Sequence, residues 1–224
     1  MPKQKPKDIT MKKFFLLLLL QVCFLKTHSQ EIVSPEEALK RLKEGNLRFL
    51  SGNTIKPRQD FLRVKELSTG QYPFATIIGC SDSRVPNEII FDQGLGDLFI
   101  VRTAGQVSSY ASWGSIEFAE EVLGTKLIVV LGHTGCGAVN AAVKQLEVPG
   151  HIVTLINAIK PAVEAAKHSD PDHLLDASIR ENIKMQVAQL KSLEPLLAKR
   201  TREGSIKIMG ALYDLSTGKV EFFE

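Results

Sequence analysis

Two cysteines and one histidine are the residues of this sequence best suited to chemistry. Cys80 opens the segment Cys-Ser-Asp-Ser-Arg, and His133 and Cys136 belong to the segment His-Thr-Gly-Cys. Two thiolates and one imidazole form a ligand set that binds zinc. Three protein ligands leave a fourth position for water or substrate, which is typical of a catalytic zinc site. We therefore predict a metal site at Cys80, His133 and Cys136.

An aspartate and an arginine accompany the first cysteine. Asp82 lies two residues beyond Cys80, and Arg84 follows two residues later. A carboxylate at this place can accept a hydrogen bond from a metal-bound hydroxide, and a planar guanidinium can keep that carboxylate ionised. Without the arginine, Asp82 would be free to become the fourth metal ligand and exclude water. The arrangement predicts attack of a metal-bound hydroxide on a small electrophilic carbon.

Each half of the motif follows an apolar segment that is typical of a buried strand. Residues 74–79 lead into Cys80, and residues 127–132 lead into His133. In an open α/β sheet, ligands bind beyond the carboxyl ends of the parallel strands. We therefore expect the two half-motifs to meet at one edge of the sheet.

The remaining pattern alternates strands with helices. Ser34, with Glu37 three residues later, predicts a capping box that opens the first helix. The order predicts an α/β fold with a parallel-centred β-sheet flanked by helices and a C-terminal hairpin strand. The other predicted helices are 110–123, 138–143, 151–167 and 171–193, and the other strands are 98–101, 206–213 and 219–223.

The first 29 residues have the layout of a secretory signal peptide. Lys12 and Lys13 precede an apolar run at 14–25, and the small residues Thr27 and Ser29 follow it. That run is shorter than the ~20 residues that a membrane-spanning helix needs. We predict a leader at 1–29, one catalytic domain at 30–224, export to the periplasm or the medium, and no membrane span after leader removal.

The charge distribution gives no reason to expect a nucleic-acid partner. The chain has 28 basic and 25 acidic residues, but six lysines and one aspartate lie in the leader. The other 195 residues therefore hold 22 basic and 24 acidic side chains, a net charge of −2. A mildly acidic domain does not attract a polyanion. We expect a small molecule as the partner.

Four segments together resemble the β-class carbonic anhydrases: Cys-Ser-Asp-Ser-Arg at 80–84, Arg-Thr-Ala-Gly at 102–105, His-Thr-Gly-Cys-Gly-Ala-Val at 133–139, and Gly-Ala-Leu-Tyr-Asp-Leu-Ser-Thr-Gly-Lys-Val at 210–220. The resemblance extends from about residue 34 to the C-terminus. It implies reversible hydration of carbon dioxide to bicarbonate and a proton. It also implies Zn²⁺ as the cofactor, bound by Cys80, His133 and Cys136, with Asp82 and Arg84 as a catalytic dyad.

The resemblance has further implications for the site and the assembly. Some members of the class close the site by moving the dyad aspartate onto zinc, so Asp82 is a possible fourth ligand in a closed state. Arg102 is a candidate for binding substrate or bicarbonate, although an arginine at a strand end can equally pair with a carboxylate. The resemblance implies a homodimer or homotetramer, with the helix at 34–50 reaching a partner subunit.

Several other interpretations of the same residues stay open. Cys80 and Cys136 could form a disulfide in an oxidising compartment, although a disulfide requires neither His133 nor Asp82. The metal site could be structural and non-catalytic, or the same fold could hydrolyse carbon disulfide or carbonyl sulfide. A cysteine phosphatase is disfavoured because Pro86 occupies the position that such a loop gives to arginine.

Proton removal from the site needs an acceptor that titrates near neutral pH. His151, His168 and His173 have suitable chemistry, and each also fits an ordinary surface position.

Overall fold

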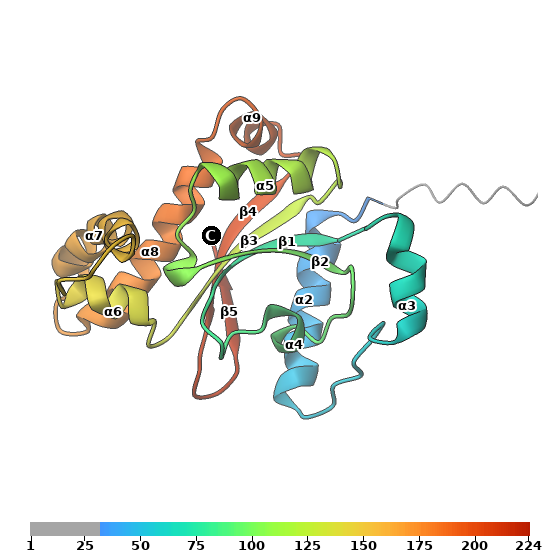
Figure 1. The fold of residues 1–224 in the computed structure, drawn as a ribbon, viewed down its shortest axis with the longest axis horizontal. Coiled ribbons are helices and arrows are strands. Elements are labelled where there is room, and N and C mark those ends of the chain that lie inside the picture. The colour runs from blue at the N-terminus through green and yellow to red at the C-terminus, as the bar shows by residue number, and fades with distance from the viewer. Residues whose placement is uncertain (1–31) are drawn as a thin grey trace, which may run out of the picture. The chain divides into compact units, whose positions relative to one another are not determined.

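The computed structural model describes residues 32–224 (Figure 1). The predicted leader at residues 1–29 lies outside the described residues, so the structure leaves that prediction untested. Among the helices of residues 32–224, none is long and apolar enough to cross a membrane.

A five-stranded sheet forms the centre of the described part of the chain. The strand order is β2 (Leu98–Thr103), β1 (Ala75–Cys80), β3 (Leu127–His133), β4 (Lys207–Tyr213) and β5 (Val220–Phe223). The first four are parallel, and β5 runs antiparallel to β4. The predicted α/β fold with a parallel-centred sheet and a C-terminal hairpin strand is therefore confirmed.

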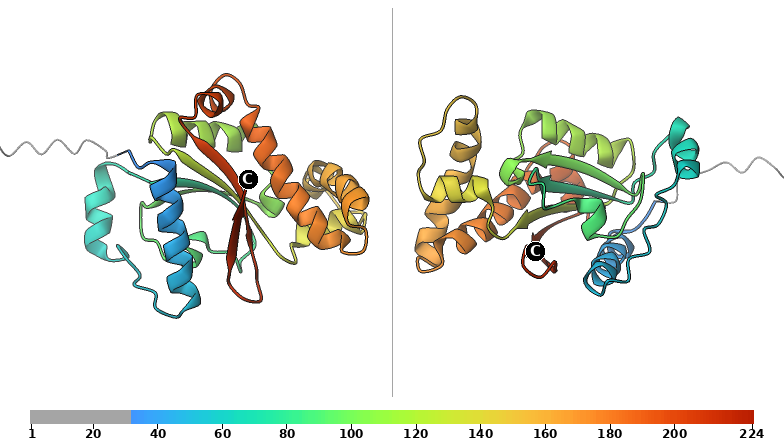
Figure 2. Two further views of the ribbon diagram at one scale, coloured as in Figure 1. Left: turned by 180° about the vertical axis from the view of Figure 1, so that it is seen from behind. Right: turned by 60° about the horizontal axis from the view of Figure 1, so that its bottom comes forward.

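Helices cover both faces of the sheet, which explains why β1 and β3 are buried along their whole length. On one face, Ile78 and Ile128 pack under α5 (Tyr110–Glu121), α6 (Gly137–Val143), α7 (Ile152–Ser169) and α8 (Leu174–Lys191). On the other face, Ile77 and Val129 pack against α2 (Pro35–Leu50) and α4 (Asn87–Ile90). Figure 2 shows α5 and α2 on opposite sides of the sheet.

The first helix departs from its predicted cap in one detail. Ser34 Oγ accepts the backbone N–H of Glu37 at 3.2 Å, as predicted. The Glu37 carboxylate does not accept the backbone N–H of Ser34, so the prediction of the reciprocal capping-box bond was wrong. That carboxylate instead accepts Arg41 Nε at 3.0 Å, because an arginine four residues later lies on the same helix face.

Three short helices were not predicted from the sequence. They are α3 (Phe61–Glu66), α4, and α9 (Leu197–Arg202), and each has six residues or fewer. Two 3₁₀ turns, η1 (Leu67–Thr69) and η2 (Ala104–Gln106), complete the elements. Helices this short have too few apolar repeats to reveal a period.

A buried aspartate fastens the segment between α2 and α3. The Asp92 carboxylate accepts Arg48 Nε at 2.6 Å and the backbone N–H groups of Ile55 and Lys56 at 3.1 and 2.9 Å. Burial by itself would raise the pKa of Asp92, but these three donors outweigh burial and leave that pKa below its ordinary value. The ionised carboxylate thus holds a segment that has no regular structure of its own.

Candidate metal centre and active site

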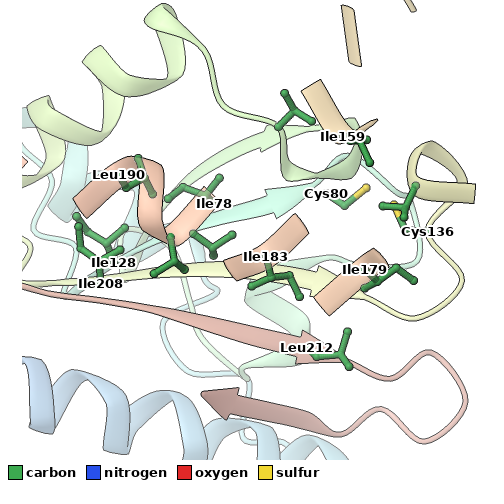
Figure 3. Packing of buried hydrophobic residues seen from close by; sticks show 14 of the residues in the cluster. Ile78, Cys80, Ile128, Cys136, Ile159, Ile179, Ile183, Leu190, Ile208 and Leu212 are labelled. Atoms are coloured by element: carbon green, nitrogen blue, oxygen red, sulfur yellow. The ribbon is translucent and has the colours of Figure 1, made fainter. Parts of the chain in front are cut away.

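The three predicted metal ligands meet at one edge of the sheet. Cys80 ends β1, His133 ends β3, and Cys136 follows three residues later. Their ligand atoms all lie within 4.8 Å of one another, and all three residues are buried. Figure 3 shows Cys80 and Cys136 side by side at this edge. Both thiols are free, so the disulfide interpretation was wrong.

Neighbouring strands hold the ends of β1 and β3 in place. The pairing of β1 with β2 continues past Cys80, where Ser81 N–H donates to Thr103 O at 3.0 Å. The pairing of β3 with β4 likewise continues past His133, where Thr134 N–H donates to Tyr213 O at 3.0 Å. Each ligand therefore projects from backbone that is fixed by sheet hydrogen bonds.

The ring of His133 is oriented for metal binding. Its Nδ1 lies 3.0 Å from the carbonyl oxygen of Thr134. Since a carbonyl oxygen can only accept, Nδ1 carries the proton and Nε2 has a free lone pair. Among the described residues, the buried Nε2 has no hydrogen-bond partner. A cation between the two sulfurs would satisfy this atom, so the residues present fit a metal ion.

The two thiols are unequal. The neighbouring Cys136 thiol lowers the pKa of Cys80 to about 4, whereas the nearby Cys80 sulfur and burial raise the pKa of Cys136. The backbone N–H of Gly105 also donates to Cys80 Sγ, at 3.3 Å. A thiolate in so buried a place requires positive charge nearby, which a metal cation would provide.

Asp82 and Arg84 form a tight pair beside the ligands. Arg84 Nε donates to Asp82 Oδ1 at 2.9 Å, and Arg84 Nη2 donates to Oδ2 at 2.7 Å. These bonds hold the pKa of Asp82 well below its usual range. Asp82 Oδ2 lies 3.8 Å from His133 Nε2, the atom that faces the metal position. The structure thus brings an ionised carboxylate to the predicted place, while its catalytic role remains a prediction.

Arg102 braces the loop that carries these residues. Its Nε donates to Cys80 O at 2.9 Å and its Nη2 donates to Asp82 O at 2.7 Å. Among residues 32–224, the partners of Arg102 are therefore backbone carbonyls and no carboxylate. Substrate binding by Arg102 stays a prediction.

The three histidines proposed as proton acceptors lie on the surface. His151 precedes α7, His168 is in its last turn, and His173 precedes α8. All three are exposed, and His173 Nδ1 lies 3.2 Å from Asp170. None of them belongs to the group of metal ligands.

One residue near the site was missed by sequence reasoning. Asn182, on α8, donates to the carbonyl of Gly105, which lies 77 positions away in the sequence. A polar residue on the buried face of a helix was the available signal. It gives no indication of the partner, because a helix pattern does not identify the loop against which the helix packs.

Comparison with known proteins identifies the family. The family model described as carbonic anhydrase matches residues 75–220. Carbonic anhydrase 2 of Mycobacterium tuberculosis is 43% identical over 190 residues, covering 83% of this chain and 91% of the relative. The solved β-carbonic anhydrase CcaA is 27% identical with a TM-score of 0.66, covering 83% of this chain and 95% of its own.

A further solved structure shares the fold alone. One of two tetrameric β-carbonic anhydrases from the ascomycete Sordaria macrospora is 22% identical with a TM-score of 0.67, covering 80% of this chain and 93% of its own. The family match, the close relative and the common fold agree with the geometry of the Cys–His–Cys cluster. The chain therefore belongs to the carbonic anhydrase family and, within it, to the β class.

Proposed function

We propose that this chain is a zinc enzyme that catalyses the reversible hydration of carbon dioxide to bicarbonate and a proton. The observation that supports this most directly is the buried Cys–His–Cys cluster with an ionised Asp–Arg pair beside it. The curated relative named carbonic anhydrase supports the same reaction.

Each site residue has a definite part in this proposal. Cys80, His133 and Cys136 would hold Zn²⁺, which when bound supplies a Lewis acid that lowers the pKa of water near neutrality. Asp82 would accept a hydrogen bond at the open position and orient the oxygen nucleophile toward carbon dioxide. Arg84 would keep Asp82 ionised and hold its carboxylate away from the metal.

The same geometry leaves room for a closed state. Asp82 Oδ2 is only 3.8 Å from His133 Nε2, so loss of the two Arg84 bonds would let the carboxylate reach the metal position. A site that closes in this way would be inactive, because the carboxylate would take the place of water. A rise in activity between pH 7 and pH 9 with unchanged zinc content would support closure by Asp82.

The test is stopped-flow hydration of carbon dioxide by the purified chain at pH 7 and pH 9, with zinc measured on the same sample. We expect hydration that a chelator abolishes and added zinc restores. Asp82→Asn should retain zinc and lose rate, whereas Asp172→Asn, at an exposed position, serves as the matched control. Zinc-loaded protein that is inert toward carbon dioxide at both pH values would overturn the proposal.

Measurements on the same samples distinguish two alternative functions. Hydrolysis of carbon disulfide or carbonyl sulfide without carbon dioxide hydration would identify a related hydrolase. A zinc-loaded chain that is inert toward all three substrates would identify a structural metal site.

The assembly and the destination of the chain are further proposals. We propose a homodimer or homotetramer, supported by the tetrameric Sordaria relatives and by the exposed apolar side chains of Tyr110, Phe118 and Val122 near α5. Light scattering after gel filtration would test this. We also propose export, supported by the leader layout. An N-terminus at residue 30 in protein recovered from cells would support it, and one at Met1 or Met11 would overturn it.

A further inference from the structure

The loop at residues 104–108 contacts the metal centre through one backbone group. Gly105 N–H donates to Cys80 Sγ at 3.3 Å. Gly105 and Gln106 have φ angles of +67° and +46°, so two successive residues adopt the left-handed region. Residues other than glycine rarely adopt this left-handed backbone conformation, and Gln106 adopts it in a buried position. This tight reversal directs the N–H of Gly105 at the sulfur.

The loop fits closely between the elements that surround the site. A Cβ atom on Gly105 would lie 2.9 Å from Ile159 Cδ1 on α7 and 3.2 Å from Ala138 Cβ on α6. Ala138 follows Cys136 by two residues, so the loop lies close to the chain segments of both sulfur ligands. A small displacement of the loop would therefore change the positions of the two sulfur atoms.

Two buried amides of α8 hold this loop. Asn182 Nδ2 donates to Gly105 O at 2.9 Å. One turn later, Gln186 Oε1 accepts from Ser108 N–H at 3.0 Å and from Ser108 Oγ at 2.7 Å. Residues four apart lie on the same helix face, so both amides form hydrogen bonds to the same loop. They do so in opposite directions, because Asn182 donates and Gln186 accepts.

Gly105 is consequently tied at both of its backbone groups. Its N–H bonds to the metal-ligating sulfur and its carbonyl bonds to Asn182. Hydrogen bonds to a ligating sulfur withdraw charge from it and orient it, and such contacts tune metal affinity and metal-site electronics.

We infer that Asn182 and Gln186 are positioning residues of the metal centre, which keep the 104–108 loop placed so that Gly105 N–H stays on the Cys80 sulfur. The inference rests on the metal site of the proposed function. It goes beyond that function because it assigns the tuning of a ligand to a helix that supplies no ligand itself. The two amides act through the 104–108 loop, Asn182 at Gly105 and Gln186 at Ser108, and neither amide is a metal ligand.

The opposite directions of the two bonds provide the test. Asn182→Asp replaces the donor by a carboxylate that faces a carbonyl, whereas Gln186→Glu retains the acceptor for both Ser108 donors. Each change puts an acid of nearly the same size into a similarly buried position. If the two amides were merely buried polar groups, the two changes would have similar effects. The positioning role predicts a large effect for the first and a small one for the second.

The readouts are the sulfur-to-cobalt charge-transfer band of the Co²⁺-substituted chain and zinc affinity from chelator competition. We expect Asn182→Asp to shift the band to lower energy and weaken zinc binding about tenfold. We expect Gln186→Glu to match the wild type, and Gln186→Leu to resemble Asn182→Asp. Ser178→Ala is the matched control, since Ser178 is buried on α8 and, within the described part of the chain, its hydroxyl bonds only the helix carbonyl of Leu174.

Asn182→Leu provides a second route if the buried acid prevents folding, because leucine removes the donor without adding charge. An unshifted band with wild-type zinc affinity in Asn182→Leu would overturn the inference, as would equal effects of Asn182→Asp and Gln186→Glu. Carbon dioxide hydration is measured in parallel on the wild type. An inert wild type with a shifted band in the Asn182 variants would refute the proposed function and leave the positioning role intact.

Discussion

Two of the arginine–aspartate pairs among residues 32–224 have similar lengths but should respond in opposite ways when the arginine is lost. Arg84 Nη2 lies 2.7 Å from Asp82 Oδ2, and Arg48 Nε lies 2.6 Å from Asp92 Oδ2. Their surroundings differ: the Asp92 side chain is 1% exposed and that of Asp82 is 17% exposed. We predict that Arg48→Leu reduces stability, and that Arg84→Leu reduces catalysis.

The expected size of the Arg48→Leu effect follows from burial. The change leaves the Asp92 carboxylate buried with only its two backbone donors, so it loses one charge-assisted hydrogen bond, about 1.5–3 kcal/mol. In a chain of this length each kcal/mol shifts the melting temperature by about 2–4 °C. We therefore expect a fall of about 3–12 °C, with an unchanged rate for the protein that remains folded.

Arg84→Leu should have the reverse profile. The Arg84 side chain is 58% exposed, and exposed ion pairs contribute little to stability, so the melting temperature should stay near the wild type. Asp82, however, loses the donors that hold its pKa low and fix its orientation. We expect the carbon dioxide hydration rate to fall about 10–100-fold with zinc retained.

The assays are thermal unfolding by circular dichroism and stopped-flow hydration, with zinc content determined for every sample. Each variant is the matched control of the other, because both remove an arginine from a short aspartate contact. A wild-type rate in zinc-loaded Arg84→Leu would refute the dyad. A wild-type melting temperature in Arg48→Leu would refute the argument from burial.

Three further predictions follow from the same contacts. Cys136→Ser and His133→Ala should each lose zinc, measured by atomic emission on the purified chain, and full zinc content in either would contradict the ligand assignment. Asp92→Asn should destabilise the chain at pH 7 and less so at pH 3. The pKa of Asp92 is lower in the folded chain than in the unfolded chain, so the ionised carboxylate stabilises the fold. This stabilisation is fully present above the unfolded pKa of about 4 and is lost as the pH falls through the folded pKa. Urea unfolding at both pH values measures this, and equal losses would contradict it. Gly105→Ala should destabilise the chain by about 1–3 kcal/mol in the same assay, because Gly105 has a positive φ and an added Cβ would lie 2.9 Å from Ile159 Cδ1. Wild-type stability would contradict this.

Much of the fold and the site could be predicted because the signals are local. The apolar runs before Cys80 and His133 indicate buried parallel strands, and the ends of such strands meet at one edge of a sheet. That rule brings together two half-motifs more than 50 residues apart without any knowledge of the structure. The short helices α3 and α9 escaped prediction because six residues are too few to show a helical period.

Residue types and spacing are enough to predict the chemistry, because two thiolates, an imidazole and an Asp–Arg pair indicate a zinc site. How these groups are held depends on the three-dimensional packing of the chain. Thr134 selects the tautomer of His133, Arg102 braces the loop of Cys80, and Asn182 fastens the loop that donates to the Cys80 sulfur. Asn182 and Gln186 bond residues more than 70 positions away. A hydrogen bond over such a separation depends on the packing of α8 against the sheet, and a pattern along the chain contains no record of that packing.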